Sequence, residues 1–329
     1  MKFIKVILLT ILCLNVGMLQ ANVLKLVTPL PNFTHKDIIE SSLKLIDVLE
    51  KYYIFPEKSQ IITKQLQYNL RSNKLNQINN LGQFIHELGI FVRRVGEDGY
   101  LNIIETSPQF KIGNSQSQVS RVPKKITSFG FEKIEILSGN IGYLKLDYFY
   151  QNPKAELKAA QVFDYLSETD AIIIDLRDVA GESISLAQYM MSFFIEQNTI
   201  LTNVIYDKQT KTKVLKSAPN LSNDRLKHNF PVYILTSAFV SGTGEFFSYT
   251  LKHLGKALIV GEKTMGVAYI SRKLRVDQFI SITMPIAIPM HPVTKTNWEQ
   301  EGVVPDFDVN ADLSFDMAYK LAKEHLNIF

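Results

Sequence analysis

Residues Pro231–Gly266, PVYILTSAFVSGTGEFFSYTLKHLGKALIVGEKTMG, decide the fold of this chain. An apolar run of strand length, Val232–Leu235, leads into the small polar segment Thr236–Gly244. Apolar and aromatic residues then recur at helical spacing, and a second apolar run, Ala257–Val260, follows. Strand, turn, helix and strand form a βαβ unit, with the turn at the helix N-terminus. Because backbone N–H groups lack partners there, this turn is where we expect a site.

The composition is that of an ordinary globular protein. Of 329 residues, 46% are hydrophobic and 21% are charged, which excludes disordered and fibrous classes. The length allows one large or two medium domains. Residues 1–21 are typical of a secretory signal peptide, because Lys2 and Lys5 precede a short apolar run. An uncleaved membrane anchor is the alternative reading of this segment.

The remaining residues exclude several classes of partner and cofactor. Without Lys2 and Lys5, 34 of the 36 basic residues face 32 acidic ones, a net charge of +2, which argues against nucleic acid as a partner. The one cysteine, Cys13, lies in the leader, so the mature chain has no thiolate chemistry. No histidine pair has metal-ligand spacing, and no nucleotide-binding fingerprint occurs. We therefore predict a protein without metal or cofactor. The leader pattern of residues 1–21 separately predicts secretion across the inner membrane into the periplasm.

Hydrophobic periodicity divides the chain into a helical part and an α/β part. Residues 22–105 predict three amphipathic helices, with a capping box at Thr34–Asp37 and Pro56 at a first helical position. The helices are expected near residues 38–52, 56–70 and 84–95. Residues 106–140 predict a linker and the strand that leads into the second part. Residues 141–329 alternate strands with helices, which indicates a mostly parallel sheet with functional residues at the strand carboxyl ends.

Five segments together carry a family resemblance. They are, in chain order, Tyr52–Lys58, Glu97–Ile103, Asp170–Ser183, Thr236–Phe247 and His291–Asp306. They resemble the C-terminal processing (tail-specific) serine protease family, and within it the branch of the interphotoreceptor retinoid-binding protein repeats and the tricorn-type core. The resemblance implies an α/β fold, a crotonase/ClpP-like β-β-α spiral with a small N-terminal helical bundle. The linker is too short for the PDZ domain found elsewhere in the family.

The resemblance also locates the nucleophile. The family carries its serine in a Thr-Ser-x-x-x-x-Ser-x-x-Glu context at the start of a helix. Aligned without gaps, Thr236, Ser237 and Glu245 match, and the nucleophile position is occupied by Gly242. Ser241 lies one residue earlier, a rotation of about 100° near a helix N-terminus. Two readings of Ser241 stay open: a helix cap, or a nucleophile in a shifted register.

The base of the family is replaced as well. A histidine that follows Asp-Gly in this branch is replaced by Tyr100. In the main branch a lysine follows a Gly-Glu-x-x-x-Gly segment, and here Val267 follows the matching Gly266. Tyrosine, with a reference pKa of about 10, is a poor base at neutral pH.

The loop that forms the family's oxyanion site is altered. Its Asp-Leu-Arg-Gly-Asn-Gly-Gly-Gly sequence reads Asp-Leu-Arg-Asp-Val-Ala-Gly-Glu over residues 175–182. Glu182 would oppose a developing oxyanion electrostatically. The resemblance assigns a binding role to Asp175, Arg177, Ala180, Gly181, Gly266 and Trp298. Glu299 matches the acidic residue that orients the charge network in the tricorn-type branch. A structural ion pair for Asp175 and Arg177, and a surface turn for Glu299, are the alternatives.

We therefore expect a secreted protein with a tail-specific protease fold and a degenerate active site. Its former catalytic cleft would bind a peptide, a protein C-terminus or an apolar small molecule. The alternative is an active serine endopeptidase in which Ser241 acts with Lys263, His291 or Glu299 as a recruited partner.

Overall fold

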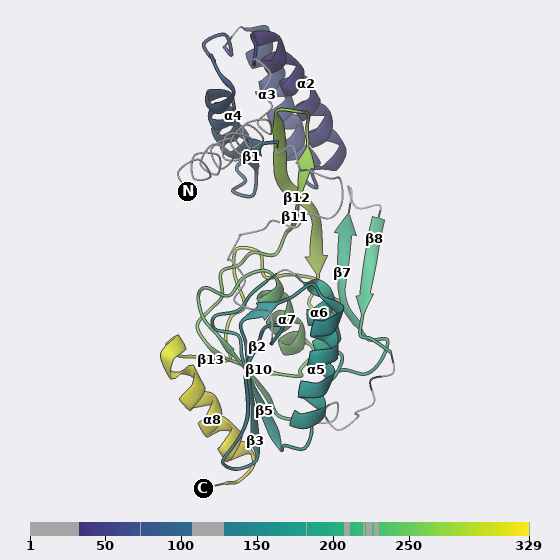
Figure 1. The fold of residues 1–329 in the computed structure, drawn as a ribbon, viewed down its shortest axis with the longest axis vertical. Helices are drawn as coiled ribbons and strands as arrows, with labels where there is room; N and C mark the ends of the chain where they lie inside the picture. Colours follow the sequence, from purple (N-terminus) through teal and green to yellow (C-terminus); the bar gives the residue numbers. More distant parts are fainter. Residues whose placement is uncertain are drawn as a thin grey trace, which may run out of the picture.

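The computed structural model describes residues 33–72, 74–106, 128–181, 183–206, 211–219, 221, 226 and 230–328. A helical unit and an α/β unit follow one another along the long axis of the molecule (Figure 1). The signal peptide predicted over residues 1–21 and the acidic residue Glu182 lie outside the described residues. Within the described part of the chain, no helix has the length and apolarity that a bilayer span requires.

Three helices form the N-terminal unit: α2 (His35–Tyr52), α3 (Pro56–Arg71) and α4 (Leu81–Gly96). The predicted capping box is confirmed, since Asp37 N donates to Thr34 Oγ1 and Thr34 N donates to the Asp37 carboxylate. Pro56 stands in the first turn of α3, as its missing N–H allows. The helices pack through fully buried side chains that include Leu45, Leu49, Ile62, Leu66, Phe84 and Val92.

A hairpin from far along the chain completes this core. The strands β11 (Ile270–Arg275) and β12 (Ile280–Met290) pair antiparallel, and β12 also pairs with β1 (Asn102–Glu105). The buried residues that the hairpin adds to the helices are Phe279, Ile280, Ile282 and Met284. The sequence assigned residues 141–329 to the α/β unit as one block, and this assignment is wrong for the hairpin. Alternating apolar residues identify a strand, but they do not specify which core it covers.

A fragment of residues 22–105, the helical unit as the sequence delimits it, is expected not to fold alone. It lacks the four buried side chains of the hairpin, which together contribute roughly 6–12 kcal/mol at about 1.5–3 kcal/mol each. That is comparable to the whole stability of a domain, about 5–15 kcal/mol. Circular dichroism and NMR dispersion check this. Fusion of residues 269–288 through a flexible linker is expected to restore folding, and cooperative unfolding of the unfused fragment would contradict the prediction.

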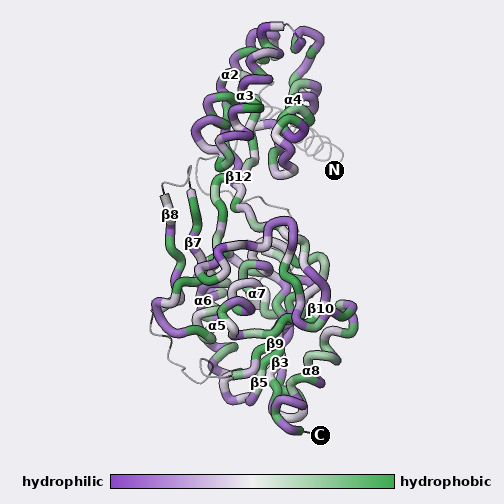
Figure 2. The backbone as a smooth tube through the Cα atoms, turned by 180° about the vertical axis from the view of Figure 1, so that it is seen from behind, coloured by the Kyte–Doolittle hydropathy of each residue, from purple (hydrophilic) through white to green (hydrophobic). Residues whose placement is uncertain are grey.

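The α/β unit is built on a six-stranded sheet with the order β13-β10-β9-β5-β3-β2. Its strands are β2 (Phe131–Leu137), β3 (Ile141–Leu146), β5 (Ala171–Asp175), β9 (Val232–Thr236), β10 (Leu258–Gly261) and β13 (Phe307–Asp308). Neighbouring strands run parallel except at the edge, where β2 is antiparallel to β3. Every residue of β5 and β9 is buried, and Figure 2 shows these central strands as largely hydrophobic. Continuous apolar runs are expected for strands covered on both faces.

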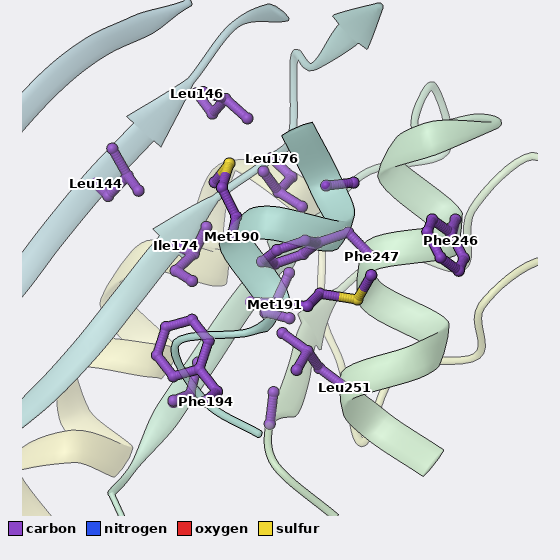
Figure 3. Packing of buried hydrophobic residues seen from close by; sticks show 14 of the residues in the cluster. Leu144, Leu146, Ile174, Leu176, Met190, Met191, Phe194, Phe246, Phe247 and Leu251 are labelled. Carbon is purple, nitrogen blue, oxygen red and sulfur yellow. The ribbon is translucent and has the colours of Figure 1, made fainter. Parts of the chain in front are cut away.

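Helices cover the two faces of this sheet. One face packs against α8 (Ser314–His325), and the other packs against α5 (Pro153–Leu166), α6 (Ile184–Met191) and α7 (Thr243–His253) (Figure 1). Figure 3 shows side chains from α6, α7 and the sheet meeting in one core, including Met190, Met191, Phe247, Leu251 and Ile174. The α/β fold with a small N-terminal helical bundle is therefore confirmed.

The remaining strands place the two units against each other. The hairpin β7 (Ile200–Tyr206) and β8 (Lys211–Lys216) pairs through β7 with the second half of β12. The first half of β12 belongs to the helical core, so β12 runs from one unit into the other. The short strands β4 (Tyr148–Phe149) and β6 (Ala180–Gly181) pair beside the start of α7.

Candidate functional site

A cavity of about 810 Å³ lies between the helical unit and the α/β unit. Its walls are the N-terminal turn of α7, the strand β6, the β7–β8 hairpin and the segment Val267–Ser271. Tyr100 reaches the cavity from the helical unit, and Trp298 from the C-terminal part of the chain. Sites for small molecules have volumes of about 300–1,000 Å³, so the cavity is large enough for such a ligand.

Gly242 forms the turn between β9 and α7 and borders the cavity. Its backbone has φ +55° and ψ −109°, in the left-handed half of φ space that favours glycine. A Cβ atom at this position would meet no other atom within 4 Å. The position that aligns with the family's nucleophile therefore faces open space, and no side chain fills it.

Ser241 borders the same cavity and is half-buried. The interpretation of Ser241 as the helix cap is wrong, because Gly242 is the N-cap and Glu245 accepts a hydrogen bond from Gly242 N at 2.9 Å. The Ser241 hydroxyl makes no hydrogen bond to any residue that the structure describes. No basic side chain among the described residues is hydrogen-bonded to it.

Glu245 is completely buried and connects the α7 turn to the neighbouring loop. Its Oε1 accepts from Thr264 Oγ1 at 2.5 Å and from Gly266 N at 2.6 Å. Its Oε2 accepts from Gly242 N and from Val267 N, both at 2.9 Å. Burial raises the pKa of Glu245, and these four hydrogen bonds to the carboxylate oppose the rise. The carboxylate thus holds two walls of the cavity together.

Gly266 and Trp298 shape the wall beside Glu245. Gly266 has φ +87°, and a Cβ there would lie 2.8 Å from the carbonyl carbon of Gln300, so no other residue fits without a backbone shift. Trp298 is 3% exposed, and its Nε1 donates to Val267 O at 3.1 Å. Its ring lies near that of Phe246, with 6.2 Å between the centroids. The indole polar atom is satisfied, so the ring supplies apolar surface.

Tyr100 and Glu299 lie 199 residues apart in sequence and meet at the cavity. Tyr100 Oη donates to Glu299 Oε2 at 2.8 Å, and the same oxygen accepts from Ala268 N at 2.9 Å and Tyr269 N at 3.3 Å. Glu299 lies in a turn, as the alternative reading predicts, but it is half-buried and its carboxylate is bonded within the protein. Burial and the hydrogen bond to Glu299 raise the pKa of Tyr100 well above its ordinary value. Tyr100 stays protonated at neutral pH and cannot accept a proton from a hydroxyl.

Asp98 and Tyr53 hold Tyr100 in place. Asp98 accepts from Tyr100 N at 2.8 Å and from Tyr53 Oη at 2.5 Å, and both Asp98 and Tyr53 are buried. Sequence reasoning missed this role of Tyr53. The available signal was that Tyr53 and Asp98 fall within two of the family-like segments, Tyr52–Lys58 and Glu97–Ile103.

The buried Asp175 forms an ion pair with the half-buried Arg177. Arg177 donates from Nε to Oδ1 at 2.9 Å and from Nη2 to Oδ2 at 2.6 Å. Tyr143 Oη also donates to Asp175, and Arg177 Nη1 donates to Ala311 O at 2.8 Å. Burial alone would raise the pKa of Asp175, but hydrogen bonds from Arg177 and Tyr143 outweigh it and hold that pKa below its usual value. The geometry supports the structural reading of this pair, although Arg177 also borders the cavity.

Ala180 and Gly181 border the cavity as the strand β6. Ala180 N donates to Asp147 O at 3.0 Å. Gly181 has φ +104°, and a Cβ there would lie 2.5 Å from Phe149 N. The N–H groups of Ala180 and Gly242 are thus both bonded within the protein, whereas an oxyanion site needs donors that point at the reacting oxygen.

The bases suggested as partners of Ser241 are not in place. No His, Lys, Cys or Glu is found among the described residues that line the cavity. Lys263 is exposed outside it. His291 is buried elsewhere, where burial lowers its pKa to about 4 and its Nδ1 accepts from Val293 N and Thr294 N.

Comparison with known proteins supplies the family. The model of peptidase family S41 matches residues 140–309. A "Probable CtpA-like serine protease" of Staphylococcus epidermidis is 30% identical over 151 residues, 45% of this chain and 29% of that protein. A protein of the same description from Staphylococcus aureus is 28% identical over 143 residues, 41% of this chain and 28% of its own length. The match spans less than a third of the length of these relatives.

Two solved structures share the fold over most of the chain. A candidate peptidase from Parabacteroides merdae has a TM-score of 0.62 at 18% identity, and the match covers 87% of this chain and 96% of that one. A lipoprotein from Streptococcus agalactiae has a TM-score of 0.58 at 13% identity, covering 91% of this chain and 99% of its own. Because the family model covers more than half of its residues, the chain belongs to peptidase family S41.

Proposed function

We propose that this S41-family protein is secreted to the periplasm and binds a ligand in its cavity without hydrolysing it. The observation that carries the proposal is the pair of replacements that face the cavity, Gly242 at the nucleophile position and Tyr100 at the base position. The leader pattern in residues 1–21 supports the secreted location. The ligand classes that such a cleft accepts are an extended peptide, a protein C-terminus or an apolar small molecule.

The groups that covalent catalysis requires are either missing from the described site or already bonded there, which supports this proposal. A serine peptidase needs an activated hydroxyl, a base within hydrogen-bond reach and free oxyanion donors. Gly242 has no hydroxyl, and Tyr100 donates its proton to Glu299. The N–H groups of Gly242 and Ala180 are bonded to Glu245 and Asp147. The cavity is nevertheless large enough for a ligand, so binding is the function that the geometry supports best.

One observation favours a second candidate, a serine endopeptidase that uses Ser241. Its hydroxyl does not cap α7, and the residue borders the cavity. This candidate requires a base to approach Ser241 when substrate binds. Hydrogen bonds between catalytic groups often tighten only in the complex with substrate.

The two candidates predict different reactions of the protein with a fluorophosphonate probe. We expect the protein without residues 1–21 to remain unlabelled and to leave casein intact, because no described base contacts Ser241. The Ser241→Ala variant should match it in both assays. Labelling that Ser241→Ala abolishes, and that the exposed-serine variant Ser185→Ala on α6 retains, would establish the endopeptidase instead.

A further inference from the structure

We infer that the segment of residues 291–297 detaches from α7 in mild acid, when His291 gains a proton, and that its release opens the cavity wall at Trp298. The segment lies between the end of β12 and Trp298. As a control over ligand binding the inference rests on the proposed function, because it concerns the same cavity. The release of the segment itself needs no ligand.

His291 is the only buried residue of this segment. It is 2% exposed, whereas Val293 is 65% exposed. Its ring packs against two side chains of α7, with 5.8 Å between its centroid and that of Tyr249 and 5.6 Å to that of His253. A hydrogen bond of 2.8 Å between Tyr249 Oη and Thr296 Oγ1 is a second attachment. The burial of His291 therefore anchors the segment on α7.

The hydrogen bonds of His291 require the neutral ring. Its Nδ1 accepts from Val293 N at 3.3 Å and from Thr294 N at 3.4 Å. The one proton of the neutral ring therefore lies on Nε2, which is buried without a hydrogen bond to any described residue. A protonated ring carries N–H groups at both nitrogens, so Nδ1 could no longer accept. The attached conformation thus fits only the neutral ring.

No described acidic group is free to stabilise a protonated His291. The titratable and charged groups around it come from α7, from the segment itself and from the residue before β13: Tyr249, Lys252, His253, Lys295 and Asp306. The one acid among them, Asp306, is already bound to Lys252 Nζ at 2.8 Å. Burial, and then the charges of His253 and Lys295, lower the pKa of His291 to about 4.

Acid therefore weakens the attachment of the segment. A released histidine has its ordinary pKa of about 6.5, whereas the attached His291 has a pKa of about 4. The attachment is complete above about pH 6.5 and weakens as the pH falls toward about 4. The linkage of the two pKa values predicts that the equilibrium constant for release rises about twentyfold between about pH 7 and pH 5.

The far end of the segment is joined to the cavity wall. Asn297 Nδ2 donates to Pro289 O at 2.9 Å, and Pro289 borders the cavity. Trp298, the next residue, also borders the cavity, and its ring lies against that of Tyr249 with 5.4 Å between the centroids. Tyr249 thus contacts both His291 and Trp298. A segment that leaves α7 therefore removes support from Trp298.

Hydrogen exchange of the protein without residues 1–21 tests the release. We expect the protection of the backbone amides of residues 293–297, corrected for the intrinsic pH dependence of exchange, to fall about twentyfold from about pH 7 to pH 5. Protection in β5 and β9 should stay constant. Trp298 is the single tryptophan, so its indole N–H gives one NMR signal, and its exchange should accelerate in parallel.

Three histidine variants assign the proton. In His291→Asn the amide oxygen accepts from the same two N–H groups and does not titrate, so protection should change by less than about twofold. His86→Asn, at an exposed histidine of α4, is the matched control and should retain the twentyfold fall. His253→Asn should retain a fall of about tenfold or more, because His291 is still present.

The unmodified protein alone can overturn the inference. Constant protection of residues 293–297 between about pH 7 and pH 5, or an equal loss in β5 and β9, would do so. A steep fall in His291→Asn, or its loss in His253→Asn alone, would overturn the assignment to His291. An indole N–H that stays protected while the segment exchanges would overturn the opening of the cavity.

The proposed function is tested separately. Fluorophosphonate labelling of Ser241 would overturn binding without hydrolysis and leave the release of the segment intact. An unlabelled protein whose segment 291–297 stays protected in acid would retain the proposed function and overturn the inference.

Discussion

The Gly242→Ser, Tyr100→His double variant is expected to react covalently with a fluorophosphonate probe that leaves the unmodified protein unlabelled. A side chain at position 242 has open space in front of it, since its Cβ would meet nothing within 4 Å. The backbone angles of Gly242, φ +55° and ψ −109°, lie outside the αL region and are strained for serine by an amount on the order of 1–3 kcal/mol, which an otherwise intact fold tolerates. A histidine at position 100 would stand beside Glu299, the present acceptor of the Tyr100 hydroxyl.

The two single variants are the controls for this gain of reactivity. A nucleophile and its base act as a unit, so either alone has little effect. General-base assistance contributes about 10²–10⁴-fold to a rate, and the double variant should exceed Gly242→Ser by about that factor. Its labelling should rise with pH as the new histidine loses its proton. A folded double variant that stays unlabelled would contradict this expectation, and would mean either that positions 242 and 100 do not face each other or that the bonded N–H groups of residues 242 and 180 leave the oxyanion without a donor.

Glu245→Ala is expected to lower the free energy of unfolding by about 3–5 kcal/mol. The substitution leaves four donors, from Gly242, Thr264, Gly266 and Val267, without their carboxylate in a buried site. Glu245→Gln should be less destabilising, because its amide oxygen accepts from two donors while its NH₂ group faces the other two. Urea unfolding followed by circular dichroism measures both changes.

Glu301→Ala provides the matched control for Glu245. Glu301 is exposed, and such surface changes usually stay within about 0.5 kcal/mol. A second readout is Trp298, whose Nε1 donates to the carbonyl of Val267, a residue held by Glu245. We expect the Trp298 emission to shift in Glu245→Ala and not in Glu301→Ala. Equal stabilities of the two variants would mean that other groups replace the lost carboxylate.

Local structure followed from the residues that form it. The capping box at Thr34, the start of α3 at Pro56 and the βαβ unit around Gly242 each depend on neighbours within a few positions. Such elements can be predicted because the hydrogen bonds and backbone angles that define them are short-range. The family resemblance also placed Gly242 and Tyr100 at one site, and both border the same cavity.

Long-range pairing could not be predicted from the same patterns. In the hairpin β11–β12 apolar residues alternate as in any half-buried strand, and this alternation does not reveal what the strand packs against. The hairpin completes the core of helices that lie about 200 positions earlier in the sequence. The capping of α7 shows the same limit on a smaller scale. Ser241 has the residue type of a cap, but the N-cap is Gly242, whose N–H donates to the buried carboxylate of Glu245. The same carboxylate also accepts from Thr264, Gly266 and Val267, which lie about 20 positions later.

The amino-acid sequence is sufficient to predict the fold class and the glycine at position 242, which aligns with the family's nucleophile, because both depend on residue identity and local order. What surrounds Gly242 depends on the tertiary structure. It joined Tyr53, Asp98, Tyr100 and Glu299 into one hydrogen-bonded chain, and it bound Arg177 to Asp175. The charge state of each group depends on how buried it is and on which partner it meets, and both are set by contacts between segments that are distant in sequence.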